Sequence, residues 1–392
     1  MKVFKYPDDF SVPEGSSIPA ELHSIREAPT LQRVEFAHAR SAWLFTRCDE
    51  IKSVRARFDA FSTTLGFDQA FSDDMPWPHL GAGASGAGEA PAPRWGRLPR
   101  IKGRRLAGHV AEIATALTAR DLLYSHRTAI DAIGDYSAPA TQRFAAGLLG
   151  VDRQAWTEAF DLHEALIDPN APPSSWAACR KQLSHLATRV LERSLAQSQN
   201  TPVRELAIAS RSASMTTEQA AGSCGALLFA ATHLLVNPLV FGICALLHEA
   251  DQLDDIRSGK SSWEDAAQEV LRFHGYGHLG LPRTALKDVT VRNTAIAAGD
   301  IVIPSPLAAS RDSRMFLDAD TFKIRRPAGL TTSAWGDLYE FLEDSVTKAF
   351  LTSALRSFFE TFPQAACTNL PQYAEIWSGG LAHRPRRLNV AI

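Results

Sequence analysis

Apolar side chains along this chain recur mostly at helical spacing, and only a few short stretches alternate as strands do. Helical spacing continues from Arg105 to about Ala250. Clear examples are TARDLLYSHRTAIDAI, ATQRFAAGLLG and DRQAWTEAFDLHEALI. Residues three and four positions apart share one face of a helix, so this spacing gives each segment an apolar face to bury. The pattern therefore predicts a mainly helical protein.

A small β region is predicted on either side of these helices. LQRVEF (31–36) and AWLFT (42–46) are β-type runs separated by polar and small residues, which is typical of a hairpin. CDEIKSVRARF follows as a helix, and residues 287–303 return to strands with AAGD as a turn. Because no internal repeat or domain-scale linker divides the chain, we expect one large domain over residues 1–392, mainly α with a small β region.

One segment is apolar enough to imitate a membrane span. LLFAATHLLVNPLVFGICALL, from Leu227 to Leu247, contains His233, Asn237 and Pro238 and has polar flanks. A single span near the middle of an otherwise polar chain would be an unusual topology. We therefore expect a long helix buried through the centre of the protein, with no membrane span.

Composition narrows the classes of function. A chain of 392 residues with 45% hydrophobic content can bury a large core, and a formal charge of -2 gives no reason to expect nucleic acid as a partner. The five cysteines form no C-x-x-C pair, so we expect no metal site. MKVFKYPDDF lacks the apolar core of a signal peptide, which favours a cytoplasmic protein with reduced thiols. The Gly/Ala/Pro-rich stretch 81–93 predicts a flexible loop.

An ordered series of motifs in the second half of the chain is more specific. Glu269 and Arg272 are three residues apart in EDAAQEVLRF and can pair on one helix face. LPRTALKDVTV, AASRD, FKIRRP and a terminal helix that runs to Phe362-Pro363 follow in that order. This series resembles the bacterial cytochrome P-450 family of haem-thiolate monooxygenases. Upstream, PTLQRVEFAHARSAWLFTRCDEIKSV looks like the first strands and B helix of that family, and GALLFAATHLLVN looks like its central I helix.

The resemblance implies the cytochrome P-450 fold and assigns roles to particular residues. Glu269, Arg272 and Arg326 would form a structural ion network, and the AATHL segment would lie at the centre of the I-type helix. The residues that would line the former substrate and haem pocket are Ala230, Ala231, Thr232, Leu234, His274, His278 and Arg283. Arg283 is the one residue that matches the set that would hold a haem propionate.

Other positions depart from the family pattern. Matching the start of the family's haem loop to Trp335-Gly336 puts Leu342 where the ligand cysteine should be, and counting back from Phe362-Pro363 gives Phe341. Neither side chain can push electron density into iron as a thiolate does. In the I-type helix, His233 and Leu234 replace the family's acid and alcohol. We therefore expect a degenerate member that binds no haem.

Two hypotheses for function follow. The rewritten haem loop is similar to that of haem-free auxiliary proteins that bind and activate glycosyltransferases in bacterial antibiotic pathways. The first hypothesis is thus a non-monooxygenase partner of a glycosyltransferase or another biosynthetic enzyme. The alternative is a cofactor-independent cyclase, isomerase or eliminating enzyme that acts on a bulky hydrophobic natural-product intermediate. His233 would be its acid or base, because imidazole titrates near neutral pH. His233, His274 and His278 could converge on a metal ion. For each of them, a buried histidine satisfied by one hydrogen bond is the simpler interpretation.

Overall fold

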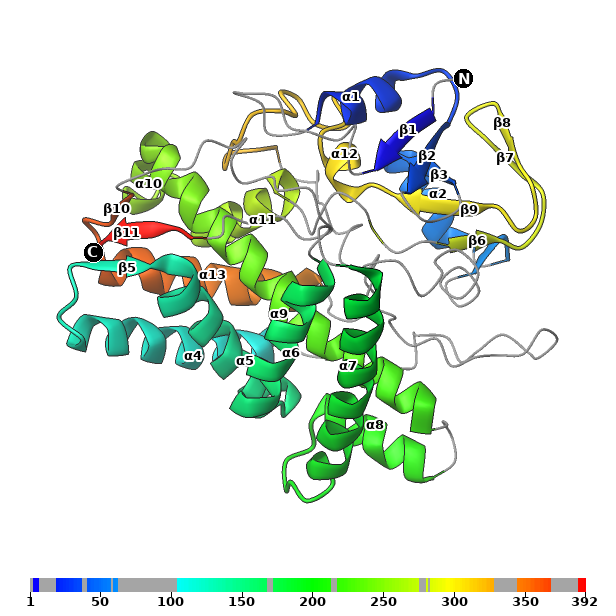
Figure 1. The fold of residues 1–392 in the computed structure, drawn as a ribbon. Coiled ribbons are helices and arrows are strands. Elements are labelled where there is room, and N and C mark those ends of the chain that lie inside the picture. The colour runs from blue at the N-terminus through cyan, green and yellow to red at the C-terminus, as the bar shows by residue number, and fades with distance from the viewer. Residues whose placement is uncertain are drawn as a thin grey trace.

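The structure is a computed structural model, in which the helices gather at one end and the main sheet at the other (Figure 1). It describes residues 3–6, 19–36, 41–57, 59–62, 104–167, 172–212, 217–274, 280, 283–327, 344–367 and 387–392. The predicted flexible loop 81–93 therefore lies outside the described residues.

The helical end is built around one long helix, α9 (Thr217–His248), which runs through its middle (Figure 1). The helices around it are α4 (Arg104–Tyr124), α5 (Ala138–Leu149), α6 (Arg153–Ile167), α7 (Pro173–Ser194), α8 (Pro202–Arg211), α10 (Ala250–Arg257), α11 (Trp263–Phe273) and α13 (Asp344–Thr361). A π-helical segment, η2 (Ala132–Ser137), leads into α5. An 18-residue window of α9 is apolar enough to cross a membrane, and it is 100% buried inside the protein. This helix therefore lies in the core of the structure.

The sheet end holds six strands in the order β1-β2-β3-β9-β6-β4. Their bounds are β1 (Val3–Tyr6), β2 (Gln32–Phe36), β3 (Ala42–Phe45), β4 (Phe61–Ser62), β6 (Arg283–Ala285) and β9 (Ile301–Pro304). The short helices α1 (Ala20–Glu27), α2 (Cys48–Ala56) and α12 (Pro306–Ser310) lie beside this sheet (Figure 1). A two-stranded hairpin is formed by β7 (Val289–Val291) and β8 (Thr294–Ile296), and a three-stranded sheet by β10 (Ala366–Cys367), β11 (Asn389–Ala391) and β5 (Ala129–Asp131).

The predicted hairpin and the predicted turn are both present. β2 pairs antiparallel with β3, with Val34 opposite Ala42. The AAGD segment turns between β8 and β9, where the Asp300 N–H donates to the Ala297 carbonyl and Gly299 has a φ of 89°. This left-handed conformation suits glycine because it has no Cβ. The expected fold class, mainly helical with a small β region, is confirmed.

One helical prediction is wrong in part. The stretch 118–133 was expected to be a single helix, but α4 ends at Tyr124 and β5 follows within the same stretch. Residues 123–129 are exposed, so the apolar face of the helix does not continue there. β5 instead pairs antiparallel with β11 near the C-terminus, with Ile130 opposite Val390. A partner from the other end of the chain therefore overrides the local spacing.

Candidate functional site

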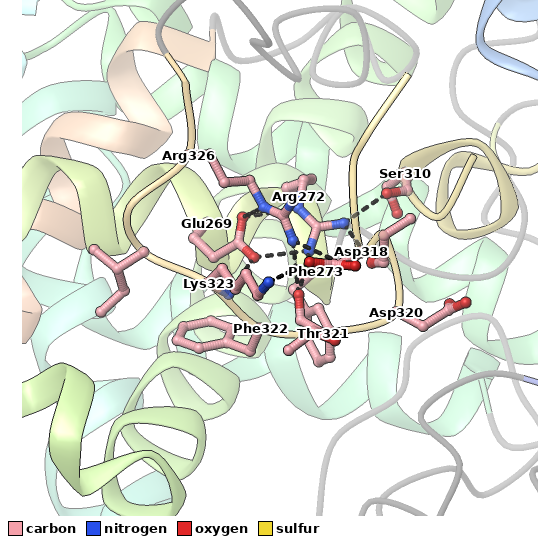
Figure 2. Close-up of polar contacts among 12 residues, drawn as sticks. Glu269, Arg272, Phe273, Ser310, Asp318, Asp320, Thr321, Phe322, Lys323 and Arg326 are labelled. Atoms are coloured by element: carbon pink, nitrogen blue, oxygen red, sulfur yellow. Dashed lines mark hydrogen bonds and ion pairs between the residues drawn. The ribbon is translucent and has the colours of Figure 1, made fainter. Parts of the chain in front are cut away.

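The first group of predicted residues meets around one carboxylate (Figure 2). Glu269 and Arg272 lie on α11. This helix begins with a capping box formed by Ser262 and Asp265. Arg272 donates two hydrogen bonds of 2.7 Å to the two oxygens of Glu269, and the Arg326 Nε donates to Glu269 Oε2 at 2.9 Å. The side chains of Glu269 and Arg272 are only 3% and 2% exposed.

Every donor of the Arg272 guanidinium has a partner. Besides Glu269, it donates to the carbonyls of Ser310, Ala319 and Thr321 at 2.7, 2.8 and 3.0 Å. Arg326 adds hydrogen bonds from its terminal nitrogens to the Leu317, Asp318 and Thr321 carbonyls. The network thus ties α11 to the chain segment that follows α12. Because all five N–H groups of Arg272 are used, its role is structural and it offers no donor to a ligand.

The second group lies between α6 and α9, around His233. The Nε2 atom of His233 is 2.7 Å from Glu164 Oε1, and its Nδ1 atom is 3.0 Å from Thr232 Oγ1. The Nδ1 atom of His163 is 3.2 Å from the same hydroxyl oxygen. His163 and Glu164 are neighbours on α6, and Thr232 and His233 are neighbours on α9. Two residues from each helix therefore form one polar cluster.

Aromatic rings enclose this cluster. The His233 ring is stacked between Phe160 and Phe229, with centroid distances of 5.3 and 5.5 Å and interplanar angles of 18° and 6°. Trp156 stacks on the far side of Phe160, and its indole N–H donates to the Ala231 carbonyl at 2.9 Å. His233 is 1% exposed, whereas the Glu164 side chain is 39% exposed. Both ring nitrogens of His233 thus contact protein atoms, and Glu164 is the part of the cluster that reaches outward.

The structure separates His274 from His233. His274 ends α11 and stacks on Phe241 at 4.4 Å, and Phe241 lies eight residues beyond His233 on α9, about 12 Å along the helix. Burial, and then the charges of Arg311 and Arg272, hold the pKa of His274 well below its usual value. No group of three or more metal-binding side chains occurs in the described part of the chain.

The other predicted pocket residues have these positions. Ala231, Thr232 and Leu234 are buried on α9, and Arg283 is buried at the start of β6. Ala230 is on α9, but its side chain is outside what the structure describes, as are His278, Phe341 and Leu342 altogether.

Sequence reasoning missed His163 and Glu164. One usable signal was present, because Trp156, Phe160 and His163 are spaced four and three residues apart on one face of the predicted helix. That spacing puts the imidazole of His163 on the apolar face, where a histidine needs a partner. Nothing in the local sequence indicates that the partner comes from α9.

Comparison with known proteins finds one family model that matches part of the chain. The family model described as Cytochrome P-450 matches residues 264–335. The chain is 24% identical to the putative cytochrome P-450 141 of Mycobacterium tuberculosis (strain CDC 1551 / Oshkosh), over 92% of this chain and 90% of that protein. The matched residues 264–335 include Glu269, Arg272 and Arg326.

Solved structures show the same fold over the full length. The crystal structure of HinD with NMFT and NO covers 100% of both chains, with a TM-score of 0.84 and 23% identity. The putative thioether synthase SgvP, involved in the tailoring step of griseoviridin, also covers 100% of both chains, with a TM-score of 0.81 and 20% identity.

These comparisons correct the expectation that the protein binds no haem. Its relatives are cytochromes P-450, which bind haem, so haem is the cofactor that this similarity implies. The expectation rested on residues 325–348, of which the structure describes only 325–327 and 344–348, and on His233 and Leu234 in α9. These local differences lie within a chain that resembles cytochromes P-450 over most of its length.

The described cysteines do not fit a thiolate ligand for that haem. All five are free, and none lies in residues 325–348. Burial raises the pKa of Cys224 to about 12, and burial together with the charge of Asp312 raises the pKa of Cys48 to about 12. Neither thiol lies within residues 325–348, where the resemblance places the ligand cysteine. We therefore derive no chemical step through haem.

The local match, the relatives aligned along most of the chain and the shared fold agree. The motif series that includes Glu269 and Arg272 lies inside the matched segment, and α9 is the long central helix that the resemblance implied. The chain has the fold of the solved cytochromes P-450, and its residues 264–335 match the family model.

Proposed function

We propose that this protein acts in bacterial natural-product biosynthesis as a non-monooxygenase partner that binds and activates another biosynthetic enzyme, such as a glycosyltransferase. The observation that carries the proposal is the absence of a cysteine in residues 325–348. Thiolate ligation favours O–O cleavage by iron, so haem held through another side chain would lack this push. The proposal is that the protein does not catalyse monooxygenation, and it does not depend on whether haem is bound.

The relatives support a biosynthetic setting. SgvP is involved in the tailoring step of griseoviridin, and relatives come from Streptomyces and Mycobacterium. We propose that the ligand of this protein is a bulky hydrophobic intermediate. Because all five cysteines are free, we also propose that the protein works in the reducing cytoplasm.

A second candidate function is favoured by the cluster around His233. A histidine and a carboxylate 2.7 Å apart can pass a proton between them, as a general acid or base must do. The reaction would be a cyclisation, isomerisation or elimination of the same class of intermediate. These reactions need proton transfer and no net oxidation.

One experiment separates these functions. The pathway intermediate is incubated with wild-type protein and the His233→Gln variant, each with and without the candidate partner enzyme. Conversion only with the partner, unchanged by the substitution, supports the auxiliary function. Conversion by the isolated wild type that falls about 10²–10⁴-fold in His233→Gln supports the enzyme.

Two further measurements complete the test. An Arg257→Ala variant, which changes an exposed pair on α10, controls for nonspecific effects. Incorporation of oxygen from labelled dioxygen into the product, or a thiolate-type spectrum of the reduced carbon monoxide complex, would contradict both candidate functions.

A further inference from the structure

The polar cluster between α6 and α9 contains one hydroxyl shared by two histidines. Thr232 Oγ1 is 3.0 Å from the carbonyl oxygens of Leu228 and Phe229, and Thr232 is fully buried. A carbonyl oxygen cannot donate, so these contacts are hydrogen bonds only if the hydroxyl donates its one proton to the helix backbone. The two lone pairs of Thr232 then remain to accept hydrogen bonds.

The two histidines fill these two acceptor positions. His163 Nδ1 and His233 Nδ1 lie 3.2 and 3.0 Å from Thr232 Oγ1. With the hydroxyl proton directed to the backbone, each Nδ1 atom must carry a proton to make its hydrogen bond. Thr232 thus selects the Nδ1–H form of both rings.

A second proton is needed between His233 and Glu164. Their Nε2 and Oε1 atoms are 2.7 Å apart, a distance that requires one proton between them. Phe160 and Phe229 both stack against the His233 ring, and aromatic faces favour a cation. The Glu164 side chain is 39% exposed, so water can solvate its carboxylate and favours the charged form. Both effects favour placing the shared proton on His233 Nε2 over Glu164 Oε1.

His163 lies in a different environment although it is in the same cluster. Its ring is edge-on to Phe229 and to His233, and within the described residues it is paired with no carboxylate. Burial, and then the charge of His233, hold the pKa of His163 well below its usual value. Two neighbouring histidines are therefore pushed toward opposite charge states, which is how acid and base roles are divided in proteins.

We propose that Thr232 and Glu164 hold His233 as a buried imidazolium beside a neutral His163, and that Glu164 is the group through which the His233 proton exchanges with bound substrate or solvent. This inference rests on the second candidate function, in which the cluster supplies an acid. His233 and Thr232 are positioning residues in this arrangement. The carboxylate at the outer end of the cluster is the group that can touch a substrate.

Imidazole ¹⁵N NMR of histidine-labelled protein tests the proposal without substrate or partner. At pH 7 we expect two protonated nitrogens on His233 and a proton only on Nδ1 of His163, with signals assigned from His233→Gln and His163→Gln. The Nε2–H of His233 should exchange with water faster than its Nδ1–H, because Glu164 is partly exposed and Thr232 is buried. A neutral His233, or equal exchange at both nitrogens, overturns the proposal.

Two variants test the positioning residues. In Glu164→Gln the charge is lost while a hydrogen-bonding side chain remains, so His233 should lose one proton at pH 7. In Thr232→Val the shared acceptor is lost, and His163 should lose its preference for Nδ1–H, whereas Thr232→Ser should retain it. An imidazolium that survives Glu164→Gln refutes the role of Glu164.

Failure of the inference can be told from failure of the function. His274, which is buried in a separate aromatic environment, serves as an internal reference and should give the same signals in every variant. The predicted protonation pattern without any conversion of an intermediate would refute only the acid–base function. Conversion by a protein with a neutral His233 would refute only the inference.

Discussion

Two pairs of residues with identical spacing have different environments. Glu269 and Arg272 on α11 are three residues apart, and so are Asp254 and Arg257 on α10. The first pair is 3% and 2% exposed, and the second is 70% and 39% exposed. In an exposed pair, water solvates each charge even when its partner is removed. In a buried pair, loss of one member leaves the other charge without compensation.

Glu269→Ala should therefore be strongly destabilising. It leaves the Arg272 guanidinium buried without its carboxylate, and we expect the free energy of unfolding to fall by about 3–5 kcal/mol. Asp254→Ala is the matched control and should change it by about 0–1 kcal/mol. Urea midpoints of the three proteins, together with soluble yield, give the comparison. Equal stability of wild type and Glu269→Ala would show that the network does not hold the fold.

At the scale of elements, α9 packs against α5, α6, α7, α8, α11 and α13, and Gly242 lies at its contact with two of them. A Cβ added at Gly242 would lie 3.0 Å from Leu355 Cδ2 and 3.2 Å from Val270 Cγ2. Leu355 is on α13 and Val270 is on α11. Gly242 thus lets three helices approach closely. A Cβ at Gly108 of α4 would meet nothing within 4 Å.

Gly242→Leu should lower the free energy of unfolding by about 1–3 kcal/mol, because the added side chain overpacks the contact of α9 with α11 and α13. Gly108→Leu introduces the same side chain into open space. It should raise stability by up to about 1 kcal/mol, because glycine is a poor helix former. Denaturation midpoints of the wild type and the two variants give the comparison. Similar effects of both substitutions would contradict the close packing at Gly242.

At the scale of the whole molecule, stability depends on buried groups that titrate differently after unfolding. The pKa values of His163 and His274 are held well below their usual range, mainly by burial. An unfolded histidine titrates near pH 6.5. As pH falls through that value, the unfolded chain binds protons that the folded chain does not bind. The folded state therefore loses stability toward acid.

We expect the free energy of unfolding to fall by up to about 1.4 kcal/mol per pH unit for each of these histidines below pH 6.5. Urea midpoints at pH 7.5 and 5.5 measure this slope. His274→Phe can retain a ring stack against Phe241 and removes one titrating group, so the slope should become shallower. A variant with the wild-type slope would show that His274 is protonated in the folded protein.

The sequence by itself determined most of the helices, the β2–β3 hairpin, the turn before β9 and the fold class. These features depend on spacings within a few residues. Glu269 and Arg272, for example, are three residues apart, which places them on one face of a helix. Local periodicity records which face of an element is apolar, and burial of that face is the main driving force for folding.

Only the tertiary structure decided the partners of those elements. β5 is a strand because β11, from the other end of the chain, supplies its hydrogen bonds, and Leu388 donates to Asp131 across 257 positions. His233 was singled out from the sequence, but Glu164 lies 69 residues away on another helix. A polar group must find a partner when it is buried, yet the packing of helices, and no fixed spacing along the chain, decides which group that is.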